Sequence, residues 1–245
     1  MIDLTLVRKP ELTSFGFKRK LKQIKRRNVP QIIVFPENTF RKKFIQDDLH
    51  LFLRSLKIRE DNYVFFSAFS RKSRNLDDVS ILDAFLEGEN GIARINDSVY
   101  KNYGYLLKLS NDKNFSFERY EKTISTEYDA HNTFNSEGSF GASYSSDYNP
   151  SIGKVEFPNL TINNRRFDFR LCADIECGVK NLPEITICSA YSLENVRGRM
   201  DSSIRNGVLI VNDVCTPIEE SIYENGEPSS PTNILERYEI NIKRG

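Results

Sequence analysis

Three side chains that can take part in covalent chemistry each lie at or just past a strand-like segment. Glu37 follows the apolar run 31–36, Cys172 ends the alternating segment 166–172, and Lys122 lies between them in the chain. Hydrolysis of an amide or nitrile through a covalent intermediate needs a nucleophile, a proton shuttle and positive charge near the developing anion. Cysteine, glutamate and lysine can fill these roles in that order. The three residues therefore predict cleavage of a C–N bond.

Each of these residues has a definite role in that reaction. The Cys172 thiolate adds to the substrate carbon, and Glu37 protonates the leaving amine and then activates the water that cleaves the thioester. Lys122 stabilises the thiolate and the oxyanion together. If the chain turns sharply after Cys172, the backbone N–H of Ala173 is the natural second donor to the oxyanion.

The segments that carry these residues resemble those of the nitrilase superfamily, the carbon–nitrogen hydrolases with a Glu-Lys-Cys triad. The stretch 32–37 looks like the family's strand ending in Pro-Glu, 120–122 like its Tyr-x-Lys, and 170–174 like its nucleophile segment. The resemblance runs from about residue 1 to about residue 215 and identifies the chain as a divergent member. It implies a single carbon–nitrogen hydrolase-like domain over 1–245, folded as an α/β four-layer αββα sandwich.

The sequence departs from the family's pattern at two places. Thr123-Ile124 stands where the family carries His-Leu or a similar pair after its lysine. Few residues separate Cys172 from the next predicted strand, so the helix that follows the family's nucleophile must be short or missing. Because family members often dimerise through the helices flanking the nucleophile, a homodimer stays open.

The resemblance also raises the question of further acidic residues near the site. Many family members position the lysine with a second glutamate, for which Glu137 is the favoured candidate and Glu127 the alternative. Asp174 matches the family's acid after the nucleophile, where we expect a structural hydrogen-bonding role. Glu176 is either a solvated loop carboxylate, the more frequent outcome, or a contact to a polar substrate.

Charge is balanced along most of the chain. The 35 Lys and Arg residues against 34 Asp and Glu residues leave a formal net charge of +1, which gives no overall field for recruiting nucleic acid or a membrane. Seven of the ten residues over 18–27 are basic. Phe17, Leu21 and Ile24 have helical spacing there, so we interpret the segment as a solvated helix face, with a phosphate or anionic-lipid patch as the alternative.

No apolar run approaches the roughly 20 residues that cross a bilayer, and the first residues lack the apolar core of a signal peptide. We therefore expect a cytoplasmic protein, with export without an N-terminal signal left open. The four cysteines lack the CxxC spacing of a zinc site and are too sparse for a disulfide scaffold. The sequence calls for neither a metal nor an organic cofactor.

The hydrophobic pattern predicts strands alternating with helices, which is typical of an α/β layered fold. Helical spacing predicts helices over 40–56 and 193–205. The polar stretch 129–153 is interpreted as a segment covering the site, and 224–233 as a surface loop. The predicted strands are 2–8, 31–36, 62–69, 103–109, 166–172, 184–189, 207–212 and 235–243.

Other functions remain as alternatives or are set aside. The main alternative is an inactive nitrilase-like scaffold that binds a partner, with the basic segment 18–27 as the candidate binding surface. A metal-dependent phosphoesterase would need a cluster of His, Asp and Asn, and neither His50 nor His131 has a partner at motif spacing. Gly-x-Ser-x-Gly and Gly-x-Gly-x-x-Gly motifs do not occur. Amide, nitrile and carbamoyl substrates all remain open.

Overall fold

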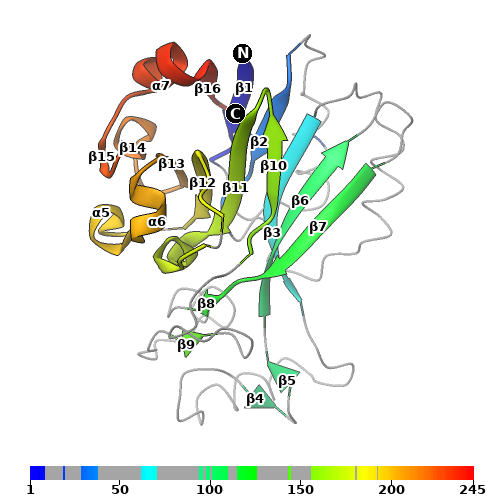
Figure 1. Ribbon diagram of the computed structural model, residues 1–245. Coiled ribbons are helices and arrows are strands. Elements are labelled where there is room, and N and C mark those ends of the chain that lie inside the picture. The colour runs from blue at the N-terminus through cyan, green and yellow to red at the C-terminus, as the bar shows by residue number, and fades with distance from the viewer. Residues whose placement is uncertain are drawn as a thin grey trace.

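The computed structural model (Figure 1) describes most of the second half of the chain and several strands of the first half. The described residues are 1–8, 19, 29–37, 62–70, 94–95, 98–99, 101–109, 115–125, 143–144, 156–179, 181–191 and 193–245. Two mixed sheets and a few short helices make up this part of the molecule.

The first sheet has the strand order β16-β1-β2-β3-β6-β7. The pairs β16–β1, β1–β2 and β2–β3 are parallel, and the pairs β3–β6 and β6–β7 are antiparallel. Its strands are β1 (Ile2–Leu6), β2 (Gln31–Val34), β3 (Asn62–Ser70), β6 (Lys101–Leu109), β7 (Phe115–Glu121) and β16 (Ile240–Arg244).

The second sheet has the order β10-β11-β12-β13-β14-β15. Here β11, β12 and β13 are parallel, and the strands on either side of them are antiparallel. Its strands are β10 (Asn159–Ile162), β11 (Arg165–Leu171), β12 (Ile185–Ala190), β13 (Val208–Asp213), β14 (Ile222–Glu224) and β15 (Glu227–Pro228).

Short elements connect or extend the sheets. The helical elements are η1 (Cys172–Glu176), α5 (Val196–Arg199), α6 (Ser202–Arg205), η2 (Ile218–Glu220) and α7 (Pro231–Tyr238). Two small antiparallel pairs are β4 (Arg94–Ile95) with β5 (Ser98–Val99), and β8 (Ile124–Ser125) with β9 (Ser143–Tyr144).

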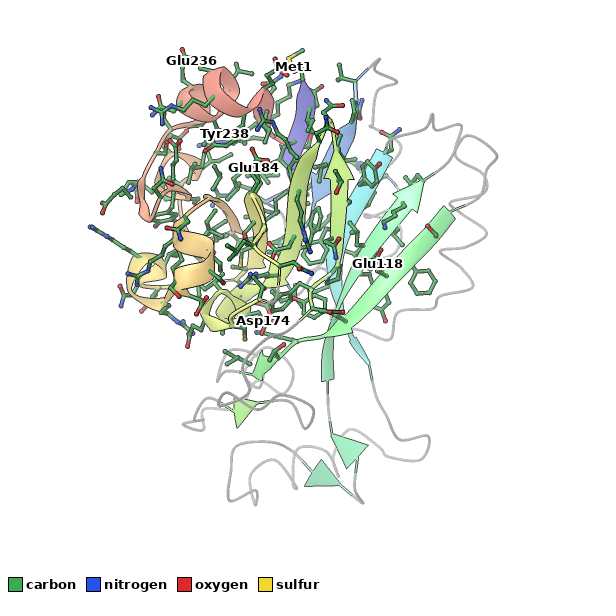
Figure 2. The ribbon with its side chains drawn as sticks, in the orientation of Figure 1. Met1, Glu118, Asp174, Glu184, Glu236 and Tyr238 are labelled. Carbon is green, nitrogen blue, oxygen red and sulfur yellow. The ribbon has the colours of Figure 1, made fainter. Side chains whose placement is uncertain are left out.

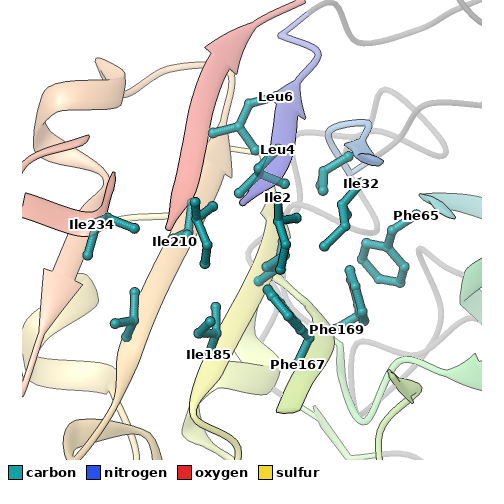
Figure 3. Close-up of a cluster of buried hydrophobic side chains, with 14 of the residues drawn as sticks. Ile2, Leu4, Leu6, Ile32, Phe65, Phe167, Phe169, Ile185, Ile210 and Ile234 are labelled. Carbon is teal, nitrogen blue, oxygen red and sulfur yellow. The ribbon is translucent and has the colours of Figure 1, made fainter. Parts of the chain in front are cut away.

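The two large sheets pack against each other through one apolar core (Figure 3). Alternate residues of β1 and β2 in the first sheet meet alternate residues of β11, β12 and β13 in the second, as expected for strands that bury one face toward a partner. The rings of Phe65 and Phe169 lie with their centroids 5.2 Å apart across this interface. The core therefore fixes how the two sheets face each other.

A helical layer covers the outer face of the second sheet. Val196 in α5 and Ile204 in α6 pack against Cys188, Leu209 and Val211, which point away from the central core. The described residues thus form two β layers and one helical layer, which are three of the four layers of the predicted αββα sandwich. The predicted helix over 40–56 lies outside the described residues.

Polar side chains tie the two sheets together at the carboxyl ends of their strands. The Asn212 side chain at the end of β13 donates hydrogen bonds to the carbonyls of Val7 and Val34, each 3.0 Å long. The Ser189 hydroxyl in β12 donates to the carbonyl of Phe35 at 2.7 Å. Buried carbonyls at the ends of the first sheet are thereby satisfied by side chains of the second.

Most of the predicted strands are found, but two segments differ from prediction. The prediction of a strand over 235–243 is wrong in its first half, because Ser230 caps α7 by accepting from the N–H of Asn233 and Pro231 occupies the first turn. The predicted helix 193–205 is divided into α5 and α6, with Asp201 capping the second. The sequence reading also missed β7, β10 and β14.

None of the helices among the described residues is long and apolar enough to span a membrane.

Replacing Asn212 by Ala should destabilise the fold, because it removes both side-chain bonds between the sheets and leaves their polar partners buried. We expect the free energy of unfolding to fall by about 1–3 kcal/mol, as for a lost buried hydrogen-bonding group. Urea unfolding would measure this loss. Asn233→Ala on the exposed face of α7 is the matched control. Equal stability of the two variants would show that the Asn212 bonds do not hold the sheets together.

Candidate active site

Glu37 and Lys122 form an ion pair in the interior. Lys122 Nζ lies 2.7 Å from Glu37 Oε1, and each residue is only 2% exposed. Glu37 lies three residues past the end of β2, and Lys122 directly follows β7. β3 and β6 lie between β2 and β7 in the sheet, so this ion pair joins two segments whose strands are not neighbours.

Burying two opposite charges constrains the structure around them. Each group loses its hydration on folding, and the attraction between them offsets this cost only when the geometry is close. Removal of one partner from a buried ion pair typically costs about 3–5 kcal/mol. A pair of this kind is expensive to keep, so its presence calls for an explanation beyond stability.

Cys172 begins a sharp turn at the end of β11. Its φ angle is +43°, in the left-handed region, and the chain continues as the short 3-10 helix η1 over Cys172–Glu176. The other non-glycine residues with positive φ among the described residues are Asn163, Asn164, Asn195, Asn225 and Glu239, the last at the C-terminal cap of α7. Asparagine tolerates this conformation, whereas cysteine is strained by it. Strain of this kind clusters at functional sites.

Asp174 connects the Cys172 turn to the segment that follows Lys122. Its Oδ1 atom accepts hydrogen bonds from the backbone N–H groups of Thr123 and Ile124, at 3.0 and 2.8 Å. Figure 2 labels Asp174 at the lower end of the sheets in that view. One carboxyl oxygen from the second sheet thus holds two amides at the end of the first.

Burial raises the pKa of Asp174 from its ordinary value of 3.8 to about 7. The nearby Lys122 charge and the Ile124 N–H oppose this rise, and the Glu37 charge adds to it. Burial and then the Asp174 charge also raise the pKa of the Tyr120 hydroxyl. Within the described residues, neither the Tyr120 hydroxyl nor Asp174 Oδ2 has a partner with hydrogen-bond geometry. The two groups interact electrostatically.

Gly104 lets the Tyr120 ring lie close to β6. Gly104 and Tyr120 are directly opposite in the β6–β7 ladder, and a Cβ at Gly104 would lie 2.3 Å from Tyr120 Cε1. Any larger residue there would displace the ring. The ring also makes an edge contact with Phe157, at 5.4 Å between centroids. This packing determines where the Tyr120 hydroxyl meets Asp174.

Arg170 holds the turn after β11 from inside the protein. It is fully buried and forms an ion pair with Asp168 at 2.9 Å. Its Nη1 atom donates to the carbonyls of Asp174 and Cys177, at 3.2 and 2.8 Å. Its guanidinium lies over the Phe157 ring, 4.5 Å from the centroid. The short η1 helix is therefore stabilised by a buried cation, which satisfies carbonyls that a longer helix would bond internally.

The surroundings of Cys172 are largely apolar. Cys172 is 2% exposed and belongs to the cluster that packs under α5 and α6. The Cys188 thiol lies 3.6 Å from the Cys172 carbonyl and is oriented to donate to it. Burial, followed by the Glu37 and Asp174 charges, raises the pKa of the Cys188 thiol well above its usual range. Cys188 is thus kept as a neutral thiol beside the turn.

The predicted site residues differ in how far the structure describes them. Glu37 and Lys122 are in contact, and the Cys172 turn is tied to the Lys122 segment through Asp174. Ala173 is buried beside Ile124, at the sharp turn on which its predicted donor role depends. The remaining candidates lie outside the described residues. They are Glu127, Glu137, His50 and His131, the covering segment 129–153 apart from β9, and the basic segment 18–27 apart from Arg19.

One expectation for the segment after Cys172 is confirmed. The helix that follows Cys172 is short, as the spacing predicted. Glu176 is an exposed carboxylate, paired with Arg199 Nε at 2.5 Å. The structural role expected for Asp174 is also seen, although its partners could not be named from the sequence.

Arg170 was missed as a part of this site, and Tyr120 was noted only as the first residue of the Tyr-x-Lys segment. A signal for Arg170 was present, because a basic residue within the otherwise apolar end of a buried strand needs buried partners. The contact between the Tyr120 hydroxyl and Asp174 carried no signal in the sequence, since tyrosine is common in strands.

Among the described residues, no group of three or more His, Cys, Asp or Glu side chains is arranged to hold a metal ion.

Comparisons with known proteins give one structural similarity. No family model and no curated protein matches the sequence. Among solved structures, the chain is similar to a CN-hydrolase superfamily protein from Xanthomonas campestris, solved with an arsenic adduct in its active site. The two are 11% identical, with 92% of this chain and 84% of that chain covered and a TM-score of 0.43. A similarity at this level leaves the chemistry to be judged from the residues of this chain.

Replacing Asp174 by Asn should change how stability depends on pH. As pH rises from 3.8 to about 7, the carboxyl ionises in the unfolded chain but stays protonated in the folded protein, so its contribution to stability decreases and then levels off. The full change corresponds to about 4 kcal/mol. Because asparagine does not titrate, the variant should gain stability relative to the wild type over this range. Denaturant unfolding at several pH values would measure this.

The matched control is Asp201→Asn, at the half-buried cap of α6, where asparagine also caps well. Parallel pH profiles for the wild type and Asp174→Asn would contradict the raised pKa.

Proposed function

We propose that this chain is a nitrilase-like amidohydrolase that cleaves a non-peptide C–N bond, with Cys172 as the nucleophile. The observation that carries the proposal is the buried Lys122–Glu37 ion pair, whose segment is hydrogen-bonded to the turn that begins at Cys172. Covalent catalysis would explain both a buried charged pair and a strained cysteine at a strand end, whereas packing alone would explain neither.

The ion pair supports a proposed first step in which Glu37 acts as a base. A glutamate paired with an ammonium at 2.7 Å is a carboxylate, so Glu37 starts as a base and takes the Cys172 proton. The sulfur then bonds to the substrate carbon, and the carbonyl electron pair moves onto oxygen. Collapse of this intermediate expels the amine, which receives the proton that Glu37 carries, and leaves a thioester.

Water completes the cycle. Glu37, again a carboxylate, takes a proton from water as the water oxygen attacks the thioester carbon. The sulfur leaves as a thiolate and takes up the proton, so the net reaction is amide plus water to acid plus amine. Lys122 stabilises the thiolate and both oxyanions, with the Ala173 N–H as the second donor. Glu137, or alternatively Glu127, supports Lys122.

The proposed substrate is a small molecule with an amide, nitrile or carbamoyl group. All bond-making and proton-transfer steps are assigned to side chains of this chain, so the proposal includes neither a metal nor an organic cofactor. A homodimer remains a prediction.

The alternative is an inactive nitrilase-like scaffold that binds a partner. One observation favours it: Cys172 is 2% exposed and packs in an apolar cluster. In that case the ion pair would be retained only for the arrangement of the strand ends.

Alkylation by iodoacetamide distinguishes the two functions. In the proposed enzyme, Cys172 should react faster than the exposed Cys215 at neutral pH, because Lys122 stabilises its thiolate. Lys122→Met should remove the preference. Peptide mass spectrometry after timed quenching would give the rate at each cysteine.

Lys108→Met is the matched control, because Lys108 also pairs with a glutamate, Glu118, but at the surface. Circular dichroism would check that each variant folds, and Glu37→Gln offers a milder change to the same pair. Slower labelling of Cys172 than of Cys215 in the wild type would favour the scaffold.

Turnover should depend on the Cys172 sulfur. We expect Cys172→Ala to abolish the release of ammonia or amine from a panel of small amides, nitriles and carbamoyl compounds, with the fold retained. Cys215→Ala should release product at the wild-type rate. Hydrolysis by Cys172→Ala at the wild-type rate would show that another group is the nucleophile.

A further inference from the structure

We propose that Asp174 is a positioning residue of this site, whose carboxyl sets where Lys122 lies relative to the Cys172 turn by binding the two amides that follow the lysine. This inference rests on the proposed function of Lys122 and Cys172. It assigns to Asp174 a task separate from nucleophilic attack and proton transfer.

The connection through Asp174 is short at both ends. Asp174 is the third residue of η1, which begins at Cys172, and Thr123 is the residue directly after Lys122. A single atom, Asp174 Oδ1, accepts from the N–H groups of Thr123 and Ile124 at 3.0 and 2.8 Å. Two bonds to adjacent amides fix both the position and the direction of the backbone after Lys122, which one bond would not.

The other end of the connection is itself held in place. The Asp174 carbonyl accepts from Arg170 Nη1 at 3.2 Å and from the Cys177 N–H at 3.1 Å. Asp174 is fully buried, so its side chain has little freedom to move. A displacement of the Lys122 segment must therefore either break the bonds from the Thr123 and Ile124 amides to Asp174 Oδ1 or move the Cys172 turn with it.

The charge of Asp174 acts on the same groups. The carboxyl interacts with Tyr120 of β7, with Lys122 directly after β7, with Glu37 after β2 and with Cys188 of β12. Arg170 of β11 binds the Asp174 carbonyl. A carboxylate accepts hydrogen bonds more strongly than a neutral carboxyl. With its pKa raised to about 7, Asp174 should hold the two amides more tightly as pH rises through neutrality.

Amide NMR tests the geometry independently of any reaction. The Thr123 and Ile124 N–H signals should titrate together with a midpoint near pH 7 in the wild type, and this titration should be absent in Asp174→Asn. The asparagine carbonyl can still accept both bonds, so this variant should keep the fold. Asp201→Asn is the matched control and should titrate like the wild type. If neither signal changes with pH or with Asp174→Asn, the inference is overturned.

Alkylation of Cys172 tests the consequence for the site. Asp174→Ala, which has no acceptor, should slow Cys172 labelling up to about 100-fold per folded molecule, as expected for a misplaced catalytic group. Asp174→Asn should retain most of the rate but lose the inflection near pH 7. Purely structural support would lower the folded fraction without changing this pH profile.

The outcomes separate this inference from the proposed function. If wild-type Cys172 labels no faster than Cys215, the proposed function fails, and the NMR titration still decides whether Asp174 holds the Lys122 segment. If Cys172 labels fast in the wild type and equally fast, with the same pH profile, in Asp174→Ala, only the positioning role fails.

Discussion

The ion pair between Lys122 and Glu37 is the constraint on which the site depends. Two charges removed from water are tolerated only in contact, so the segments after β2 and β7 must meet, although β3 and β6 separate these strands in the sheet. The chain ties both segments to the second sheet, through Ser189 to the Phe35 carbonyl and through Asp174 to the Thr123 and Ile124 amides. A conformation that separates them would lose the close contact between two buried charges.

The interface between the sheets changes character along its length. Its middle is apolar, with side chains such as Phe65 and Phe169 in contact. At the carboxyl ends of the parallel strands, Asn212, Ser189 and Asp174 instead cross from the second sheet to backbone groups of the first. An apolar interface alone tolerates small shifts, whereas hydrogen bonds to defined carbonyls and amides fix the register. Reactive groups at the polar end of the interface can therefore be held in precise positions.

Cys172 combines features of a reactive and of a packing residue. Its left-handed backbone and position at a strand end are typical of a presented nucleophile, while its burial beside Cys188 is typical of a thiol in a core. The charged groups nearby distinguish the two thiols. Cys188 is kept neutral by burial and by the Glu37 and Asp174 charges, whereas the segment of Lys122 is hydrogen-bonded to the turn that Cys172 begins.

Local pattern determined much of the fold and supplied the candidate site residues. Alternating apolar residues predicted the central strands, and a carboxylate, an ammonium and a thiol in family-like segments predicted the chemistry. Local pattern failed at 235–243, where the cap at Ser230 and Pro231 favours a helix that the apolar spacing did not reveal. Only the tertiary structure decided that Lys122 and Glu37, 85 residues apart, form one buried pair, and that Asp174 holds the amides of Thr123 and Ile124. Such contacts depend on how the two sheets pack. Packing brings together residues that are far apart along the chain, and no local sequence pattern indicates which of them will meet.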